Sequence, residues 1–300
     1  MSVLVVGSIA YDSVETPWGS VKDSPGGSAL YFSAAASMFC PVNVVGVVGS
    51  DFDMSKISFL KKRGVNFDGI YIESGETFRW GGRYRTDLNM RDTLYTLLNV
   101  FENFQPKIPS HYKKAEYVFL ANIDPELQLQ VLDQIDKPKL IILDTMNFWI
   151  SGKRKHLDEV IKRCDIILLN DQESREISGQ PNIIKAARMI SELGPNVVII
   201  KKGEHGAMLY HDNRYFFAPA YPLEKVVDPT GAGDSFAGGF VGYVAKFGKI
   251  DDEVLRKGVI YGSTIASFNV EDFSFNRLIN LKKEDLEKRI KKFKELTCFD

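Results

Sequence analysis

Residues 228–240 read Asp-Pro-Thr-Gly-Ala-Gly-Asp-Ser-Phe-Ala-Gly-Gly-Phe, and this stretch predicts a loop that opens a helix. Turn-forming residues give way there to an apolar run that ends near Phe247. Gly231 and Gly233 can adopt positive φ and leave backbone N–H groups bare, and the N-terminus of the following helix adds positive potential. The stretch therefore predicts an anion-binding site of the kind that favours phosphate.

Asp234 follows these glycines directly, and its position has two interpretations. A carboxylate beside an anion site can take the proton from a hydroxyl group that attacks a phosphoryl group. Alternatively, Asp234 or Ser235 simply caps the helix, as Asp and Ser often do. The short Gly-x-Gly-Asp pattern leaves both interpretations open.

The whole stretch resembles the C-terminal signature of the ribokinase-like, or phosphofructokinase-B type, family of sugar and nucleoside kinases. Pro229 stands where the family usually has Thr. Because proline has no N–H group, the donors of the anion hole must come from Gly231 to Gly233. The resemblance implies that Asp234 is the catalytic base, that Gly231, Ala232 and Gly233 form the anion hole, and that Asp228 and Thr230 contact the nucleotide.

Length, composition and charge exclude several other classes of protein. The 300 residues are 44% hydrophobic and 26% charged, which is ordinary for a soluble globular protein with a sizeable core. The formal charge of −1 provides no field that would attract nucleic acid or an anionic membrane. No apolar run approaches the roughly 18 residues of a membrane span. Neither nucleic acid nor a membrane is therefore an expected partner.

The three cysteines, Cys40, Cys164 and Cys298, are odd in number and far apart. They fit neither a disulfide framework nor a paired-cysteine zinc site, so they are typical of reduced thiols. The first residues lack a basic leader and read as a strand over 3–6. We expect a cytoplasmic protein.

Alternating apolar runs and helical segments predict the fold. Buried-strand runs at 3–6, 42–48, 117–120, 140–143, 166–169 and 196–200 are separated by helical patterns. This order predicts one α/β domain over 1–300, with a doubly wound, mainly parallel sheet covered by helices. Residues 70–101, rich in aromatic and β-branched residues, predict an inserted antiparallel ribbon. The family resemblance, which extends from Gly7 to about Phe268, implies that this ribbon is a small β lid over the substrate.

The acceptor side of the site is expected at Asp12, Gly26, Gly27, Tyr31 and Arg83. Asp12 lies just beyond the first strand, where it is either a turn residue or a ligand group, and the resemblance implies that it holds substrate hydroxyls. The glycine pair matches the family's N-terminal signature, where the backbone passes close to the sugar. Tyr31 replaces the family's usual Asn, so an aromatic ring could stack on the acceptor there. Arginines on a ribbon usually form a solvated face, and Arg83 is the candidate for the substrate side.

Two further pairs of polar residues follow predicted strands. Asn122 and Asn147 are each either a substrate or phosphate contact or an ordinary loop Asn. Asn170 and Glu173 fit a helix-capping box. The resemblance instead implies the family's Asn-x-x-Glu motif, which organises Mg²⁺ and its waters around the phosphates.

The segment Lys202, Gly203 and Gly206 is a turn after the strand at 196–200. The resemblance implies that it contacts the nucleotide. Residues 269–274 lack the Gly turn that the family has beside a monovalent-cation site, so K⁺ activation is left open.

The resemblance implies transfer of the ATP γ-phosphoryl group, with Mg²⁺, to a hydroxyl of a small sugar, polyol or nucleoside, and pairing of two copies through the lid. The alternatives are an adenosine-type nucleoside kinase specifically and a non-catalytic sugar or nucleotide sensor on the same fold. A P-loop, a dinucleotide fingerprint and a hydrolase elbow are excluded because their glycine patterns are absent or misplaced in this chain.

Overall fold

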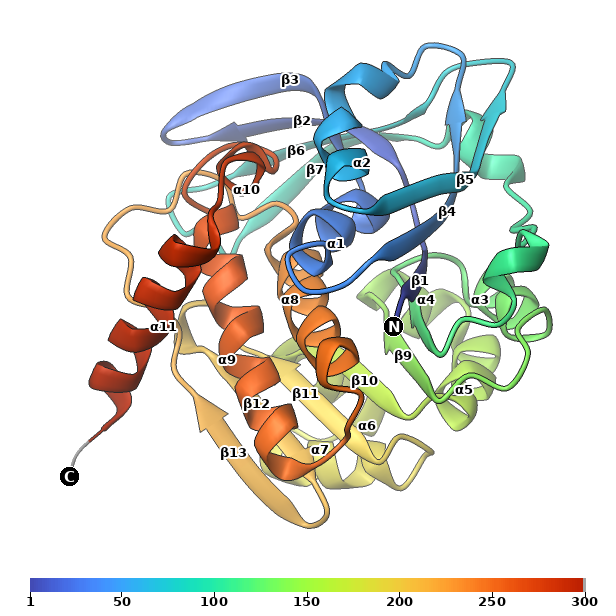
Figure 1. Cartoon of the computed structure of the whole chain (residues 1–300). Coiled ribbons are helices and arrows are strands. Elements are labelled where there is room, and N and C mark those ends of the chain that lie inside the picture. Colours follow the sequence, from blue (N-terminus) through green and yellow to red (C-terminus); the bar gives the residue numbers. More distant parts are fainter. Residues whose placement is uncertain (299–300) are drawn as a thin grey trace.

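A nine-stranded sheet forms the centre of the protein, in the order β13-β12-β11-β10-β9-β8-β1-β4-β5 (Figure 1). The computed structural model describes residues 1–298. The seven neighbouring strands β11, β10, β9, β8, β1, β4 and β5 pair in parallel. Strands β12 and β13 continue the sheet beyond β11 in antiparallel pairing. The strands are β1 (Val3–Val6), β4 (Val42–Gly49), β5 (Val65–Glu73), β8 (Tyr117–Leu120), β9 (Leu140–Asp144), β10 (Ile166–Asn170), β11 (Val197–Lys201), β12 (Ala207–His211) and β13 (Arg214–Ala218). The predicted parallel sheet is confirmed.

Helices cover both faces of this sheet. Alternate residues of β1 point into two separate cores, with Val3 and Val5 on one side and Leu4 and Val6 on the other. The first core is closed by α1, α8 and α9, which lie in front of the sheet in Figure 1, and the second by α3, α5, α6 and α7. The helices are α1 (Ser28–Ala36), α2 (Ser58–Lys62), α3 (Pro125–Leu132), α4 (Asn147–Gly152), α5 (Arg154–Arg163), α6 (Asp171–Ser178), α7 (Ile183–Ser191), α8 (Ala232–Phe247), α9 (Asp252–Asn269), α10 (Asn276–Ile279) and α11 (Lys283–Thr297).

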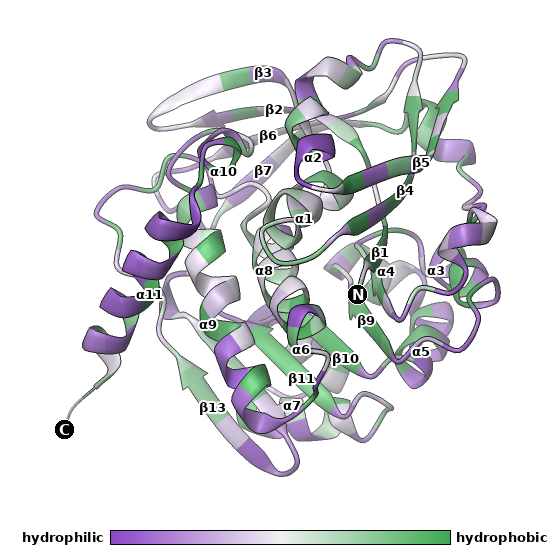
Figure 2. Cartoon of the chain, in the orientation of Figure 1, coloured by the Kyte–Doolittle hydropathy of each residue, from purple (hydrophilic) through white to green (hydrophobic). Residues whose placement is uncertain are grey.

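Hydropathy follows these layers. The central strands β10 and β11 are largely hydrophobic, whereas α11 on the outside is mostly hydrophilic (Figure 2). Helix α8 can pack closely on α1 because Gly238 has no side chain, and a Cβ atom there would lie 2.3 Å from the carbonyl oxygen of Phe32. Across residues 1–298, none of the helices combines the length and the apolar character that a membrane crossing requires.

A second sheet of four strands, in the order β3-β2-β6-β7, forms the lid at the top of Figure 1. Its strands are β2 (Ala10–Thr16), β3 (Gly19–Gly26), β6 (Phe78–Tyr84) and β7 (Arg91–Leu97). The lid differs from the predicted ribbon of 70–101, because residues 70–73 belong to β5 and because β2 and β3 supply half of its strands. Asp12 consequently lies within a lid strand and not in a turn after β1.

Candidate active site

The site lies where the carboxyl ends of β9, β10 and β11 meet the N-terminus of α8. These parallel strands end in Asp144, Asn170 and Lys201, so all three side chains start from one edge of the sheet. Helix α8 begins beside them at Ala232, after Gly231 in the left-handed conformation at φ 73°. At this end of the sheet, a carboxylate, an amide and an ammonium group therefore lie close to the positively polarised N-terminus of a helix.

Asp234 occupies the first turn of α8. Burial raises the pKa of its carboxyl group to about 7, and the nearby Asp144 raises it further while Lys201 lowers it. A carboxyl with a pKa near neutrality can accept a proton at physiological pH and release it again. The structure thus gives Asp234 the environment of a general base.

The backbone of residues 229–235 forms the predicted cradle with one difference. The N–H group of Ala232 donates to the carbonyl of Pro229 at 3.2 Å, and that of Ser235 donates to Gly231 at 2.8 Å. Within residues 1–298, the N–H group of Gly233 makes no hydrogen bond to another residue, whereas the N–H group of Asp234 lies against its own carboxylate. Ala232 closes the turn, so its N–H group is used within the loop. The anion hole at Gly231 and Gly233 stays a prediction.

Asp228 and Thr230, which the resemblance places beside the nucleotide, hold the loop itself. The carboxylate of Asp228 is fully buried and accepts from the N–H groups of Thr230 at 2.8 Å and Ser274 at 3.3 Å. The side-chain amide of Asn269 donates to the carbonyl of Thr230 at 2.9 Å. Since buried charge must be hydrogen-bonded, this carboxylate serves first to fix the loop before α8.

Asp12 faces the loop from the lid. Burial raises the pKa of Asp12 to about 7, the backbone of Gly27 opposes this shift, and Asp228 and Asp234 add to it. A Cβ atom on Gly26 would lie 2.0 Å from the Asp12 carboxylate, so that position requires glycine. Gly27 has φ 90°, which also favours glycine. Gly26 therefore makes room for Asp12, and Gly27 makes room for the backbone of Ser8, whose carbonyl oxygen would lie 2.5 Å from an added Cβ atom.

Tyr31 does not offer a face for stacking, contrary to the sequence interpretation. Its side chain is 1% exposed, and its ring covers Gly231, where an added Cβ atom would lie 2.2 Å from the ring. Phe275 meets the same ring edge-on at 5.7 Å between centroids. The tyrosine hydroxyl is buried without a hydrogen-bond partner in the described chain. Tyr31 thus packs under the glycine loop, because the absence of side chains at Gly231 leaves a space that an aromatic ring fills.

The lid contributes Tyr84 to the site instead of Arg83. Successive side chains of a strand point to opposite faces. Arg83 pairs with Glu15 at 2.6 Å and is 56% exposed, whereas Tyr84 is buried and accepts a hydrogen bond from the Thr230 hydroxyl at 3.2 Å. The aromatic, period-two pattern of β6 was a signal for Tyr84, but the sequence did not say which face looks inward.

The two loop asparagines have different environments. Asn122 accepts a hydrogen bond from the Trp149 indole at 3.0 Å, which fixes the start of the loop after β8. Asn147 begins α4, and its side-chain nitrogen is buried without a partner among the described residues. Asn147 thus has a buried donor without a partner in residues 1–298, whereas the bond of Asn122 to Trp149 uses its oxygen and not its amide nitrogen.

The turn of Lys202, Gly203 and Gly206 is built by its backbone. The N–H group of Lys202 donates to Gly206 at 2.7 Å, and a Cβ atom on Gly206 would lie 2.0 Å from the carbonyl oxygen of Ala218. Asn89 of the lid loop approaches Gly203 and bonds Glu204 at 3.5 Å. The tip of the lid therefore rests on this turn.

Asn170 and Glu173 form the capping box at the start of α6. The Glu173 carboxylate accepts from the N–H of Asn170 at 2.6 Å, and the Asn170 side chain accepts from the N–H of Glu173 at 2.7 Å. Burial raises the pKa of Glu173 to about 7, with Lys201 opposing and Asp144 adding to the shift. The capping interpretation is confirmed. A role toward Mg²⁺ stays a prediction.

Lys201 and Asp144 are the site residues that sequence reasoning passed over. The ammonium nitrogen of Lys201 lies 3.1 Å from a carboxylate oxygen of Asp144, and the side chains are only 17% and 6% exposed. A sequence signal for both was available. Each is a charged residue at the last position of an otherwise apolar strand, just as Asn170 is a polar residue at the end of its strand.

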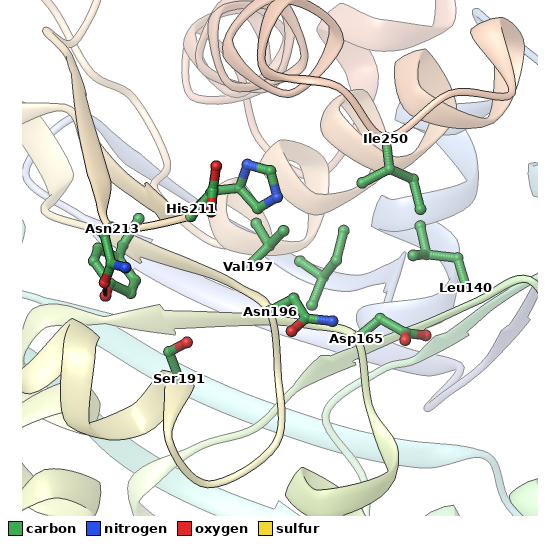
Figure 3. Close-up of a pocket in the computed structure, with 11 residues that line it drawn as sticks. Leu140, Asp165, Ser191, Asn196, Val197, His211, Asn213 and Ile250 are labelled. Carbon is green, nitrogen blue, oxygen red and sulfur yellow. Dashed lines mark hydrogen bonds between the residues drawn. The ribbon is translucent and has the colours of Figure 1, made fainter.

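A cavity of about 480 Å³ lies at the opposite edge of the sheet, near the amino ends of β9, β10 and β11 (Figure 3). Leu140 and Ile250 lie on one side of it and His211 and Asn213 on another. The Nδ1 atom of His211 lies 3.2 Å from a carboxylate oxygen of Asp252. This cavity is separated by the length of the strands from the edge that carries Asp234.

Comparison with known proteins places this site in a family. The family described as pfkB family carbohydrate kinase matches residues 2–278, and the chain belongs to it. Cytidine kinase of Thermococcus kodakarensis is 29% identical over 265 residues, covering 86% of this chain and 94% of the relative. A nucleoside kinase of Methanocaldococcus jannaschii is 25% identical over 82% of this chain and 81% of the relative.

Solved structures agree on the fold. The crystal structure of the Methanocaldococcus jannaschii nucleoside kinase has a TM-score of 0.77 at 23% identity, with 97% of this chain and 98% of that chain covered. A putative ribokinase II from E. coli in complex with ATP and Mg²⁺ has a TM-score of 0.79 at 20% identity, with 97% and 99% covered. The protein is an ATP-dependent kinase of sugars or nucleosides.

Proposed function

We propose that the protein transfers the γ-phosphoryl group of ATP to the primary hydroxyl of a nucleoside, with cytidine as the first acceptor to test. The observation that carries the reaction is Asp234, a carboxyl with a pKa raised to about 7 at the positive end of α8, next to Gly233, whose N–H group makes no hydrogen bond to another residue in residues 1–298. The acceptor class is supported by relatives named cytidine kinase and nucleoside kinase.

Each group then has a defined task. Asp234 takes the proton of the acceptor hydroxyl as its oxygen attacks phosphorus. The N–H group of Gly233 and the helix potential stabilise the negative charge of the phosphoryl oxygens. Burial and, to a smaller extent, the charges of Asp228 and Asp234 raise the pKa of Asp12, so these three carboxyl groups lie near one another. From there Asp12 orients the acceptor through its hydroxyls.

The residues present fit a Mg²⁺ ion that keeps most of its waters. Glu173 uses one carboxylate oxygen in the capping box and leaves the other without a hydrogen bond in residues 1–298. The same part of the chain holds no group of three acidic, His or Cys side chains arranged for a metal. Mg²⁺ commonly binds through one or two carboxylates and substrate phosphates. Asn170 and Glu173 would hold it through water, and the ion would neutralise phosphate charge.

A screen of the purified protein tests the acceptor. ADP release is coupled to an optical readout with ATP, Mg²⁺ and, in turn, cytidine, other nucleosides, sugars, polyols and sugar phosphates. We expect the highest kcat/KM with a nucleoside, and mass spectrometry of the product should show one added phosphoryl group. A sugar or polyol as best acceptor would replace the nucleoside in the proposal, and ATP binding without turnover of any acceptor would favour the sensor alternative.

A further inference from the structure

The ammonium group of Lys201 lies over the first turn of α8. Lys201 is the last residue of β11, and a Cβ atom placed on Gly233 would stand 3.3 Å from its Nζ atom. Gly233 is also one of the residues whose N–H group is unpaired within residues 1–298. The ammonium group of Lys201 therefore lies beside the glycine of the first turn of α8 whose N–H group is not used by another residue of the described chain.

The surroundings of this cation are acidic. Asp144 contacts it at 3.1 Å, and Glu173 and Asp234 are its other charged neighbours. Burial alone would lower the pKa of Lys201, but these carboxylates outweigh burial and raise it, so the side chain stays charged. A lysine ammonium is a compact, mobile point charge with three donors, well suited to phosphate oxygens.

We propose that Lys201 is a catalytic residue that leaves Asp144 and binds an oxygen of the γ-phosphoryl group during transfer. The proposal rests on the proposed function. The bond between the acceptor oxygen and the γ-phosphorus forms, the bond from that phosphorus to the β–γ bridging oxygen breaks, and ADP keeps the electron pair. The acceptor proton goes to Asp234, and Lys201 keeps its own proton throughout. Asp144 holds the ammonium group while no nucleotide is bound and competes with the phosphoryl oxygen for it.

A variant cycle separates this role from simple charge neutralisation. Lys201→Met should lower kcat by about 10²–10³, the usual cost of removing a group that stabilises transition-state charge. The double variant Lys201→Met/Asp144→Asn removes both charges of the pair and should stay as slow. Recovery of the double variant to within about tenfold of wild type would mean that Lys201 only balances Asp144, and it would overturn the proposal.

Nucleotide binding provides a readout without turnover. Calorimetry with ADP and with a non-hydrolysable ATP analogue, in the absence of acceptor, gives the preference for a γ-phosphoryl group. Lys201→Met should reduce this preference at least about tenfold, or 1.4 kcal/mol. Equal weakening of both ligands contradicts the proposal. Because no acceptor is present, this comparison stands even if the proposed acceptor class is wrong.

Two further variants distinguish loss of a catalytic group from loss of folding. Arg289→Met removes another ion-paired cation. The Arg289 side chain is 13% exposed, and its guanidinium lies 2.6 Å from a carboxylate oxygen of Glu271, more than 50 positions after the glycine loop in the sequence. This variant should lower the melting temperature while the folded fraction keeps its kcat. If Lys201→Met does not fold, Asp144→Asn decides the matter. It frees Lys201 and should increase the preference for the ATP analogue over ADP, and an unchanged preference would overturn the proposal.

Discussion

At the scale of single residues, Asp234 combines a functional role with a cost to stability. Asp234→Asn removes the base, and we expect kcat to fall by roughly 10²–10⁴, the usual contribution of a general base. The amide avoids burying a carboxylate, so the melting temperature at pH 7 should rise and ADP affinity should persist. Steady-state kinetics, calorimetry and thermal melts check these outcomes. Near-wild-type turnover would remove Asp234 from the reaction.

The pH profile reports the same carboxyl group. Asp234 must be ionised to accept a proton, and its pKa is raised to about 7. We therefore expect kcat/KM to be constant above that pH and to fall tenfold per unit below it. The measurement is kcat/KM from pH 5 to 9 at saturating Mg²⁺. If the acidic limb of the kcat/KM profile has its midpoint near pH 4, burial does not raise the pKa of Asp234 in solution.

Tyr31 is a packing residue in this structure, and its truncation tests that directly. Tyr31→Ala empties the space beneath Gly231 and should cost about 3–5 kcal/mol of unfolding free energy, as for other large aromatic side chains. Tyr31→Phe keeps the ring and loses a hydroxyl that lies near Asp12 and Ser274 but forms no hydrogen bond within 3.5 Å to the described residues, so its effect on unfolding free energy should be small beside that of Tyr31→Ala. Urea unfolding of both variants gives the comparison. A stable Tyr31→Ala with a raised acceptor KM would instead restore the stacking interpretation.

At the scale of elements, α6 begins with a capping box that lies beside the phosphate edge. Glu173→Gln keeps an acceptor for the N–H of Asn170 while it removes the charge. Stability should therefore change little, and the Mg²⁺ concentration for half-maximal rate should rise. Asn182→Ala, at the cap of α7, is the matched control and should cost about 1 kcal/mol without any effect on Mg²⁺. A lower melting temperature with an unchanged Mg²⁺ titration would leave Glu173 as a cap only.

The elements also show what the sequence could and could not predict. Strand runs such as 166–169 and the start of α8 follow from local patterns of apolar residues, glycine and capping residues, and these were predicted. The pairing of β2 with β6 joins residues about 70 positions apart, and no local pattern encodes it. Tyr84 and Lys201 were missed for the same reason, because their importance depends on which strand lies next to which.

At the scale of the whole molecule, several buried acids link stability to pH. The pKa of Asp12, Glu173 and Asp234 is raised to about 7 in each case, against about 4 in unfolded chains. Between these values the folded state binds more protons, so stability should fall as pH rises from 5 to 7 and then level off. Melting temperatures across this range check the prediction. Asp234→Asn should show a smaller fall, and an equal fall would assign the effect to other groups.

The hydrogen bond from the Ser274 hydroxyl to the carbonyl of Pro25, at 2.7 Å, joins parts of the chain separated by 249 positions. Asp228 also accepts a hydrogen bond from the N–H group of Ser274, so residue 274 joins the glycine loop to the segment that leads into α1. During synthesis, at about 5–20 residues per second, the strands of the sheet are made before Ser274, which forms these hydrogen bonds. The nascent chain can thus build its strands early, whereas the two hydrogen bonds of Ser274 form only after residue 274 has been synthesised.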